Sequence, residues 1–272
     1  MIKQSFNRKL HLGAQLVKCT GLAGDGFLVY NRAMADHASA NPLSYRYPHP
    51  AVTVDCVIFG LDGQSLKVLL NRRDLVPFRD AWALPGGFIG IDEGLEDAAR
   101  RVLQAETGVH DLYLEQLYSF GTPDRDPRER VITIAYYAIV NLFDHPVGKA
   151  APSCASQEAG WFAMDRLPAL AFDHSAIIET ALARLQAKIR YQPIGFGFLP
   201  RKFTLTQLQK LYEAILCTSL DKRNFRKKIL STGLLVPLDE MEMDVAHRAA
   251  KLYRFDDRLY GELRQRGFNF AV

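Results

Sequence analysis

The chain has 272 residues, of which 48% are hydrophobic and 24% are charged; these values are ordinary for globular proteins and exclude the disordered and membrane-protein classes. No stretch approaches the roughly 18 consecutive apolar residues of a membrane-spanning helix, so we expect no membrane association. The net charge is +4, but residues 200–272 carry 14 Lys and Arg against 9 Asp and Glu, an asymmetry typical of an appended nucleic-acid-binding module.

Residues 1–45 show no sustained periodicity, and we expect an N-terminal extension there. The sequence leaves open whether translation begins at Met1 or at Met34. Basic residues near the start are not followed by a continuous apolar run, so no signal peptide is expected. The four cysteines lie far apart and form no CxxC pair, which argues against disulfides and a zinc site and favours a cytoplasmic location.

Residues 46–190 alternate between period-2 and helical hydrophobic patterns. The expected strands cover residues 52–58, 66–70, 112–120 and 131–140, a short segment begins at residue 161, and the expected helices cover 94–107 and 173–189. Asp173 is the expected N-cap of the second helix, and a glycine-rich loop at 85–87 precedes the first. Mixed strands and helices predict an α/β sandwich over this range.

The remaining chain predicts a compact α-rich domain over 203–272, after a proline- and glycine-containing linker at 191–202. Thr204 and Gln207 are spaced as a capping box for a helix that runs through Cys217. Asp221 is the expected N-cap of a second helix, which Gly233 ends. A two-stranded ribbon at 234–238 and 251–255 and a last helix near 256–266 follow, and this order describes a winged helix-turn-helix.

The second of these helices has the pattern of a DNA-recognition helix. Phe225 and Ile229 are four residues apart and should pack in the core, which leaves Arg223, Asn224 and Lys227 on the opposite side. Arginine and asparagine are the side chains that pair with guanine and adenine edges. The predicted DNA-binding residues are Thr204, Thr206, Lys222, Arg223, Asn224, Arg226, Lys227, Lys228, His247, Arg248 and Lys251.

A segment around the first helix resembles the Nudix signature, G-x5-E-x7-R-E-U-x-E-E-x-G-U, where U is a bulky aliphatic residue. Residues 87–109 read GFIGIDEGLEDAARRVLQAETGV, and the preceding WALPG is similar to the usual lead-in. The matching residues are Gly87, Glu93, Arg101, Leu103, Glu106, Gly108 and Val109. This resemblance implies a Nudix α/β/α sandwich with a mixed sheet.

Two positions of the signature differ from its pattern. Active relatives place several carboxylates on one face of this helix around Mg²⁺, whereas this chain has Val102 and Ala105 there and retains Glu106. We therefore expect no catalytic residue and no required cofactor, with weak Mg²⁺ binding only if residual hydrolase activity exists. Ligands recruited from elsewhere, namely Glu96, Asp97 or Glu129, remain the alternative.

The loop at residues 121–130, GTPDRDPRER, resembles the charged loop of ADP-ribose-type Nudix proteins. Its arginines are suited to bind a diphosphate bidentately without a metal, and Trp82 or Phe88 could stack on an adenine. A solvated surface loop and a plain core tryptophan are the alternatives. The predicted effector-binding residues are Arg73, Trp82, Gly86, Gly87, Phe88, Glu106, Arg125, Arg128 and Arg130.

A closer resemblance covers residues 46–258. The segments AFDHSAIIETAL, FTLTQLQKLYEAILCTSLDKRNFRKKIL and AKLYRF are similar to the Nudix-related transcriptional regulators of NAD metabolism. This implies a homodimeric repressor that binds double-stranded operator DNA and an ADP-ribose-like effector. From chain order alone, we expect coupling through helix 173–189 and the linker, since these join the two domains. Three alternatives remain: a sister regulator of pentose use, an ADP-ribose pyrophosphatase whose C-terminal domain only dimerises, and a DNA-binding protein with a purely structural Nudix domain.

Overall fold

The computed structural model describes residues 47–63, 65–107, 113–142, 156–243, 249–268 and 270. The chain divides into two units, Met1–Pro48 and His49–Val272, and the elements described below all lie in the second. The expected extension at 1–45, with the alternative start at Met34, falls outside the described residues. Within the described part of the chain, no helix is long and apolar enough to cross a membrane.

A mixed sheet forms the first half of the His49–Val272 unit, as the sequence predicted. Its strands are β1 (Ala51–Leu61), β2 (Leu66–Arg73), β3 (Trp82–Ala83), β4 (Gly86–Phe88), β5 (Tyr113–Phe120), β6 (Val131–Asn141) and β7 (Ser156–Ala163). The order is β3-β2-β1-β6-β5, with β4 paired to β1 and β7 to β2. β1 and β6 run parallel along eleven residue pairs, while the other pairings are antiparallel. The short β3 and β4 were not predicted.

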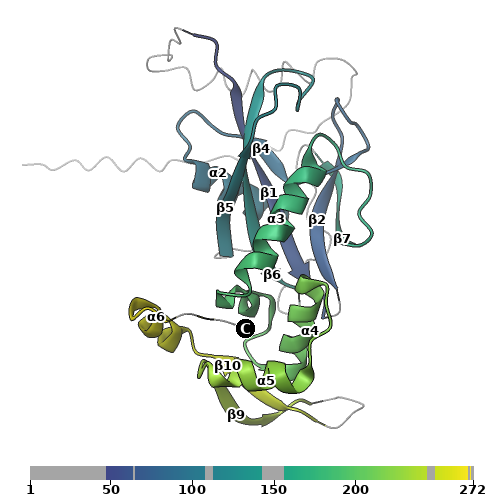
Figure 1. Cartoon of the computed structure of the whole chain (residues 1–272). Helices are drawn as coiled ribbons and strands as arrows, with labels where there is room; N and C mark the ends of the chain where they lie inside the picture. Colours follow the sequence, from purple (N-terminus) through teal and green to yellow (C-terminus); the bar gives the residue numbers. More distant parts are fainter. Residues whose placement is uncertain are drawn as a thin grey trace, which may run out of the picture. The chain divides into compact units, whose positions relative to one another are not determined.

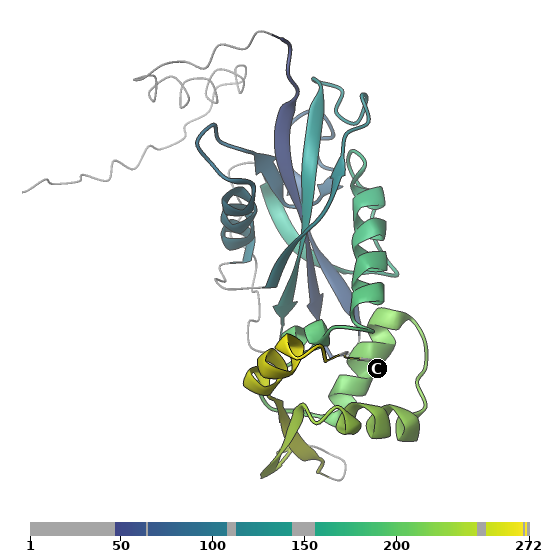
Figure 2. The same ribbon diagram turned by 60° about the vertical axis from the view of Figure 1, so that its left-hand side comes forward.

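Helices α2 (Leu95–Thr107) and α3 (His174–Lys188) cover opposite faces of this sheet (Figures 1 and 2). The alternation along β1 explains the two cores, because successive side chains of a strand point to opposite faces. Val57, Phe59 and Leu61 pack in the core on the α3 side. Their neighbours at 54, 56 and 58 pack with α2. The predicted α/β/α sandwich is thus confirmed.

The second half of the unit is a winged helix. Its elements are η1 (Pro193–Phe198), β8 (Phe203–Thr204), α4 (Leu205–Leu216), α5 (Lys222–Ser231), β9 (Leu235–Met241), β10 (Lys251–Phe255) and α6 (Asp257–Gln265). The strands form a small sheet in the order β8-β10-β9. The predicted ribbon is confirmed, and β8 is an additional strand that the sequence pattern did not reveal.

Part of the predicted linker at 191–202 packs in the core. It contains the 3-10 helix η1, and Phe198 and Leu199 are buried. A single hydrophobic cluster includes β1, α3, these residues and the inward face of α4. The boundaries at 190 and 203 stay predictions, but the segment between them packs tightly against both neighbours.

Candidate functional site

The loop that precedes α2 is held in shape by an ion pair between Glu93 and Arg101. Arg101 donates from Nε and Nη2 to the two carboxylate oxygens of Glu93 at 2.6 and 2.8 Å, and to the carbonyl oxygen of Phe88 at 3.2 Å. The backbone N–H of Gly90 donates to the same carboxylate at 3.0 Å. These hydrogen bonds, that from Arg101 above all, lower the pKa of Glu93 to about 2. The pair therefore stays charged at neutral pH and stabilises the loop.

Three positions on α2 decide whether this loop and helix fit a metal ion. Val102 is buried in the core on the α2 face, with its Cγ2 3.9 Å from where a Cβ on Gly87 would lie. Ala105 is exposed and Glu106 is buried. Among the described residues, no three His, Cys, Asp or Glu side chains lie close enough together to hold a metal ion. Since Mg²⁺ prefers about six oxygen ligands and positions 102 and 105 supply none, the residues present do not fit the magnesium ion that the signature implies.

The substitute ligands considered from the sequence do not repair this deficit. Glu96, Asp97 and Glu129 are all exposed. Glu96 is also engaged by Arg100 across one helical turn at 2.6 Å. The donor set that remains beside Glu106 is therefore poor in oxygen ligands.

Arg125, predicted to bind an effector, is buried among carboxylates. Its side chain is 4% exposed and donates from Nε and Nη2 to Asp173 at 2.9 and 2.6 Å. Nη2 also donates to Oδ2 of Asp55 at 3.3 Å. Burial opposes the charge, yet the hydrogen bond to Asp173 and the charge of Asp55 raise the pKa of Arg125. Arg125 thus joins the 121–130 loop to β1 and to the start of α3, and a direct ligand contact would require it to leave these partners.

His174 belongs to the same buried cluster. Its Nδ1 accepts a hydrogen bond from the backbone N–H of Leu84 at 2.9 Å, and its Nε2 lies 3.8 Å from Oδ1 of Asp55. Burial lowers the pKa of His174, in keeping with an Nδ1 that must be unprotonated to accept. Gly86 packs so closely that a Cβ there would lie 2.3 Å from Asp55 Oδ1. The sequence analysis missed Asp55 and His174; a charged residue inside the apolar run of β1 was the available signal.

Two further predicted arginines lie near this cluster. The guanidinium carbon of Arg73 is 4.7 Å from the ring centre of Phe172, and its Nε donates to the carbonyl oxygen of Pro77 at 3.1 Å. Burial, followed by the charge of Arg128, lowers the pKa of Arg73. Arg128 binds Asp126 bidentately at 3.0 and 2.7 Å. The structure therefore gathers Arg73, Arg128 and the buried cluster on one side of the domain.

The other predicted effector residues differ in exposure. Arg130 is exposed, and its Nη1 donates to the carbonyl oxygen of Thr122 at 2.9 Å. Trp82 packs against the main core and contacts Phe162 edge-on, with 4.5 Å between ring centres. Phe88 is partly buried in the β1–β4 pairing. Trp82 therefore packs against the core, which was the alternative to adenine stacking in the sequence analysis.

The α5 helix presents the predicted basic face. Phe225 and Ile229 are 6% and 0% exposed, whereas Arg223, Asn224 and Lys227 are exposed. The predicted orientation of the helix is therefore confirmed. Lys222 and Lys228 are exposed beside them, and Asp221 Oδ1 caps the helix by accepting from the N–H of residue 224 at 2.8 Å.

Two threonines of the predicted DNA face have structural partners. Thr204 is 2% exposed, and it forms the predicted capping box with Gln207 through bonds of 3.2 and 2.7 Å. This burial removes Thr204 from the surface expected to contact DNA, which corrects that prediction. The exposed Thr206 hydroxyl accepts from Nη2 of Arg226 at 3.1 Å. Arg226 therefore joins α5 to the start of α4.

The wing is described only in part. Lys251 is exposed at the start of β10. His247 and Arg248 lie outside the described residues, so their predicted DNA contacts stay predictions. The charged residues that the structure describes on the wing include Glu240, whose carboxylate accepts from Lys202 Nζ at 2.6 Å.

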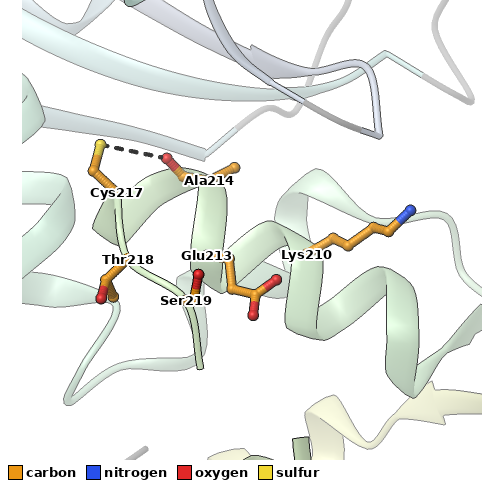
Figure 3. Close-up of a pocket in the computed structure, with 6 residues that line it drawn as sticks. All are labelled: Lys210, Glu213, Ala214, Cys217, Thr218 and Ser219. Atoms are coloured by element: carbon orange, nitrogen blue, oxygen red, sulfur yellow. Dashed lines mark hydrogen bonds between the residues drawn. The ribbon is translucent and has the colours of Figure 1, made fainter. Parts of the chain in front are cut away.

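Two hollows lie beside α4. One, at its C-terminal end, is lined by Lys210, Glu213, Ala214, Cys217, Thr218 and Ser219 (Figure 3). The other, about 290 Å³ in volume, is lined by residues of α4 and α5 together with Arg190, and includes Asn224 and Lys228. No predicted effector-binding residue lines either hollow, whereas the second reaches the basic face of α5.

Comparison with known proteins matches both halves of the chain. The model of the NUDIX domain matches residues 49–184, and the model of the NrtR DNA-binding winged helix domain matches residues 195–255. The chain is 37% identical over 215 residues to the ADPR responsive transcriptional repressor NtrR of Acinetobacter baylyi, which covers 77% of this chain and 83% of that protein.

Two further similarities concern a solved structure and an enzyme. The crystal structure of Shewanella oneidensis NrtR complexed with a 27mer DNA matches with a TM-score of 0.66 and 34% identity, covering 75% of this chain and 93% of that one. The ADP-ribose pyrophosphatase of Methanocaldococcus jannaschii is 38% identical over 133 residues, which cover 49% of this chain and 73% of the enzyme.

Proposed function

The chain belongs to the NrtR family, since a Nudix domain and an NrtR-type winged helix occur in it in succession, and from this membership we propose that it is a transcriptional repressor whose Nudix domain senses ADP-ribose or a similar nucleotide sugar. The combination of two features carries the proposal. Helix α2 of the Nudix domain has Val102 and Ala105 in place of carboxylates, and helix α5 of the winged helix has an exposed basic face. The former disfavours metal-dependent chemistry, and the latter suits DNA.

The DNA-binding half of the proposal rests on α5. Its exposed Arg223 and Asn224 have the hydrogen-bonding groups that read base edges in the major groove. Lys222, Lys227 and Lys228 add positive charge that would neutralise phosphates. The A. baylyi relative is a transcriptional repressor and the S. oneidensis relative was crystallised with DNA, which supports the same role here.

The sensing half rests on the arginines around the 121–130 loop. Arg128 and Arg130 are exposed, and Arg128 would exchange its pairing with Asp126 for the ligand. A guanidinium group pairs bidentately with phosphate oxygens, so these side chains would hold a diphosphate without a metal ion. The responsiveness of the A. baylyi relative to ADP-ribose supports this effector class. No cofactor is required by this reading.

We further propose a homodimer that acts in the cytoplasm, where a bacterial repressor would meet its operator. Two winged helices would contact half-sites about one helical turn of DNA apart, and effector binding would change their separation and release the DNA. NAD-related genes are the proposed regulon, with pentose use as the alternative.

An ADP-ribose hydrolase is the second candidate function. Similarity to the M. jannaschii pyrophosphatase over the Nudix half of the chain favours it. The side chains at 102 and 105 count against it, because they provide no oxygen ligand for Mg²⁺. A regulatory role therefore fits the residues of α2 better than a catalytic one.

The proposed function is tested by a gel-shift assay with the full chain and DNA from upstream of its own gene, titrated with ADP-ribose. We expect a retarded complex that disappears as ADP-ribose is added, while equimolar AMP with ribose 5-phosphate, the two halves of the ligand, leaves it intact. The absence of any DNA complex would overturn the repressor. A complex that survives millimolar ADP-ribose would overturn the sensor.

A further inference from the structure

Helix α3 connects the Nudix domain to the winged helix by polar contacts at both of its ends. It has 15 residues, which correspond to a length of about 22 Å at 1.5 Å per residue. Figures 1 and 2 show that it runs along the sheet and ends beside α4. Its inward face, including Ile177, Ala181 and Leu185, is fully buried, so the helix is packed as one rigid element.

The N-terminal end of α3 is bound to the predicted effector loop. Asp173 occupies the N-cap position, yet its side chain makes no capping hydrogen bond. Its two carboxylate oxygens instead accept from Nε and Nη2 of Arg125, at 2.9 and 2.6 Å. Such a bidentate, charge-assisted pair has a fixed geometry. The 121–130 loop therefore cannot shift without moving the first turn of α3 or breaking this pair.

The next residue binds a second loop. His174 accepts from the N–H of Leu84 at 2.9 Å, and Leu84 comes two residues before Gly86. Two consecutive positions at the start of α3 thus contact the arginine loop and the residue that directly precedes the glycine-rich segment 85–87. A ligand held between these segments could displace the start of α3 through both Asp173 and His174.

The C-terminal end of α3 contacts the first helix of the winged domain. Gln186 Nε2 donates to the carbonyl oxygen of Ile215, in α4, at 2.9 Å. Ile189 and Leu211 lie on either side of Gly195, 3.1 and 3.3 Å from where its Cβ would be. Lys188 also pairs with Glu115 of β5, which adds a polar contact between the last turn and the sheet.

We propose that Asp173 and Gln186 are positioning residues that transmit effector binding to the DNA-binding domain. The Asp173–Arg125 ion pair carries a displacement of the 121–130 loop into α3, which moves as one rigid element, and the Gln186–Ile215 hydrogen bond passes this movement to α4. This inference rests on the proposed function, because it assumes that ADP-ribose and DNA bind the same chain. Neither residue is among the side chains predicted to contact the effector or the DNA.

The coupling factor, which is the ratio of operator Kd values with and without saturating ADP-ribose, is the decisive measurement. It is obtained by fluorescence anisotropy with the full chain, and ADP-ribose affinity is measured separately by calorimetry. For the unmodified protein we expect a ratio within the about 5–150-fold range of protein allostery. Asp173→Asn should bring the ratio close to one while each separate affinity stays within about threefold, an effect that loss of structure alone would not produce.

Asp165→Asn is the matched control, since Asp165 lies in the same β7–α3 connection, has a 73% exposed side chain and pairs with the neighbouring Arg166 at 3.7 Å. It should leave the ratio unchanged. Gln186→Ala tests the far end of α3 and should also reduce the ratio. If Asp173→Asn lowers the melting temperature too far to be assayed, the ratio of the Gln186→Ala variant tests the inference instead. An unchanged ratio in these variants overturns the inference, whereas a ratio of one in the unmodified protein overturns the proposed function itself.

Discussion

At the scale of single residues, His174 shows how burial sets the chemistry of this protein. Its imidazole is almost completely buried, and burial lowers its pKa although the carboxylates of Asp55 and Asp173 act in the opposite direction. The hydrogen bond from Leu84 to Nδ1 would be lost on protonation, because a protonated nitrogen cannot accept. The folded state therefore requires neutral imidazole.

This requirement predicts an acid-sensitive stability. The unfolded chain takes up a proton at the ordinary histidine pKa of 6.5, above the lowered value in the folded state. The free energy of unfolding should consequently fall as the pH drops below about 6.5, by at most about 1.4 kcal/mol per pH unit for one proton. Urea unfolding between pH 7.5 and 5 measures it. His174→Gln should flatten this dependence, while His49→Gln, at an exposed histidine, should not; equal slopes in the two variants would contradict the prediction.

Residue-level expectations held where partners are near in sequence and failed where they are distant. The Thr204–Gln207 capping box and the Asp221 cap join residues three apart, and both were predicted from spacing. Asp173 does occupy its predicted N-cap position, but its partner is Arg125, 48 residues away. Asp55 and Arg125 are 70 residues apart. No local pattern identifies such a pair, since it exists only after β1, the loop and α3 have packed.

At the scale of elements, helical periodicity alone identifies the buried and the exposed face of α5. The positions at 225 and 229 are buried, and the three predicted base-contacting side chains are exposed. Periodicity suffices here because a helix turns about 100° per residue, so one apolar stripe defines the opposite face. It does not reveal that Arg226 bonds Thr206 of α4, because that contact crosses between two helices.

The same geometry predicts the cost of removing one base-reading side chain. Arg223→Ala should weaken operator binding by about 1–3 kcal/mol and relax the base preference at one position. Arg166→Ala removes the same charge from an arginine with an 85% exposed side chain in the Nudix domain, and should change affinity far less. Anisotropy titrations with operator and single-base variants measure both. If the two substitutions have equal effects, α5 is not the recognition helix.

At the scale of the whole molecule, a sensor and an enzyme use ligand-binding energy differently. A sensor must hold ADP-ribose long enough to shift an equilibrium between two arrangements of its domains, whereas a hydrolase must stabilise a transition state with a correctly placed metal. One hydrophobic core extends from the Nudix sheet into α4, which is the continuity that a sensor requires. Val102 and Ala105 on α2, which supply no oxygen ligand for Mg²⁺, also favour a sensor over a hydrolase.

We therefore expect binding without turnover. With ADP-ribose and Mg²⁺, the full chain should release AMP and ribose 5-phosphate no faster than a sample without protein, while calorimetry detects binding. The M. jannaschii pyrophosphatase provides the active comparison. Turnover well above background that Glu106→Gln abolishes would instead identify an enzyme, because Glu106 is the one signature carboxylate retained on this face of α2.

The sequence by itself determined the two-domain order, most strands and helices, the capping box of α4, the N-cap of α5, the orientation of α5 and the carboxylates missing from α2. All of these depend on spacings within one turn or one strand, or on residue identity. Tertiary structure decided that Arg125 is buried between Asp55 and Asp173, that Thr204 is inaccessible, and that the expected linker is part of the core. These features arise from contacts between segments far apart in the chain, whose geometry is set only when the sheet and helices pack together.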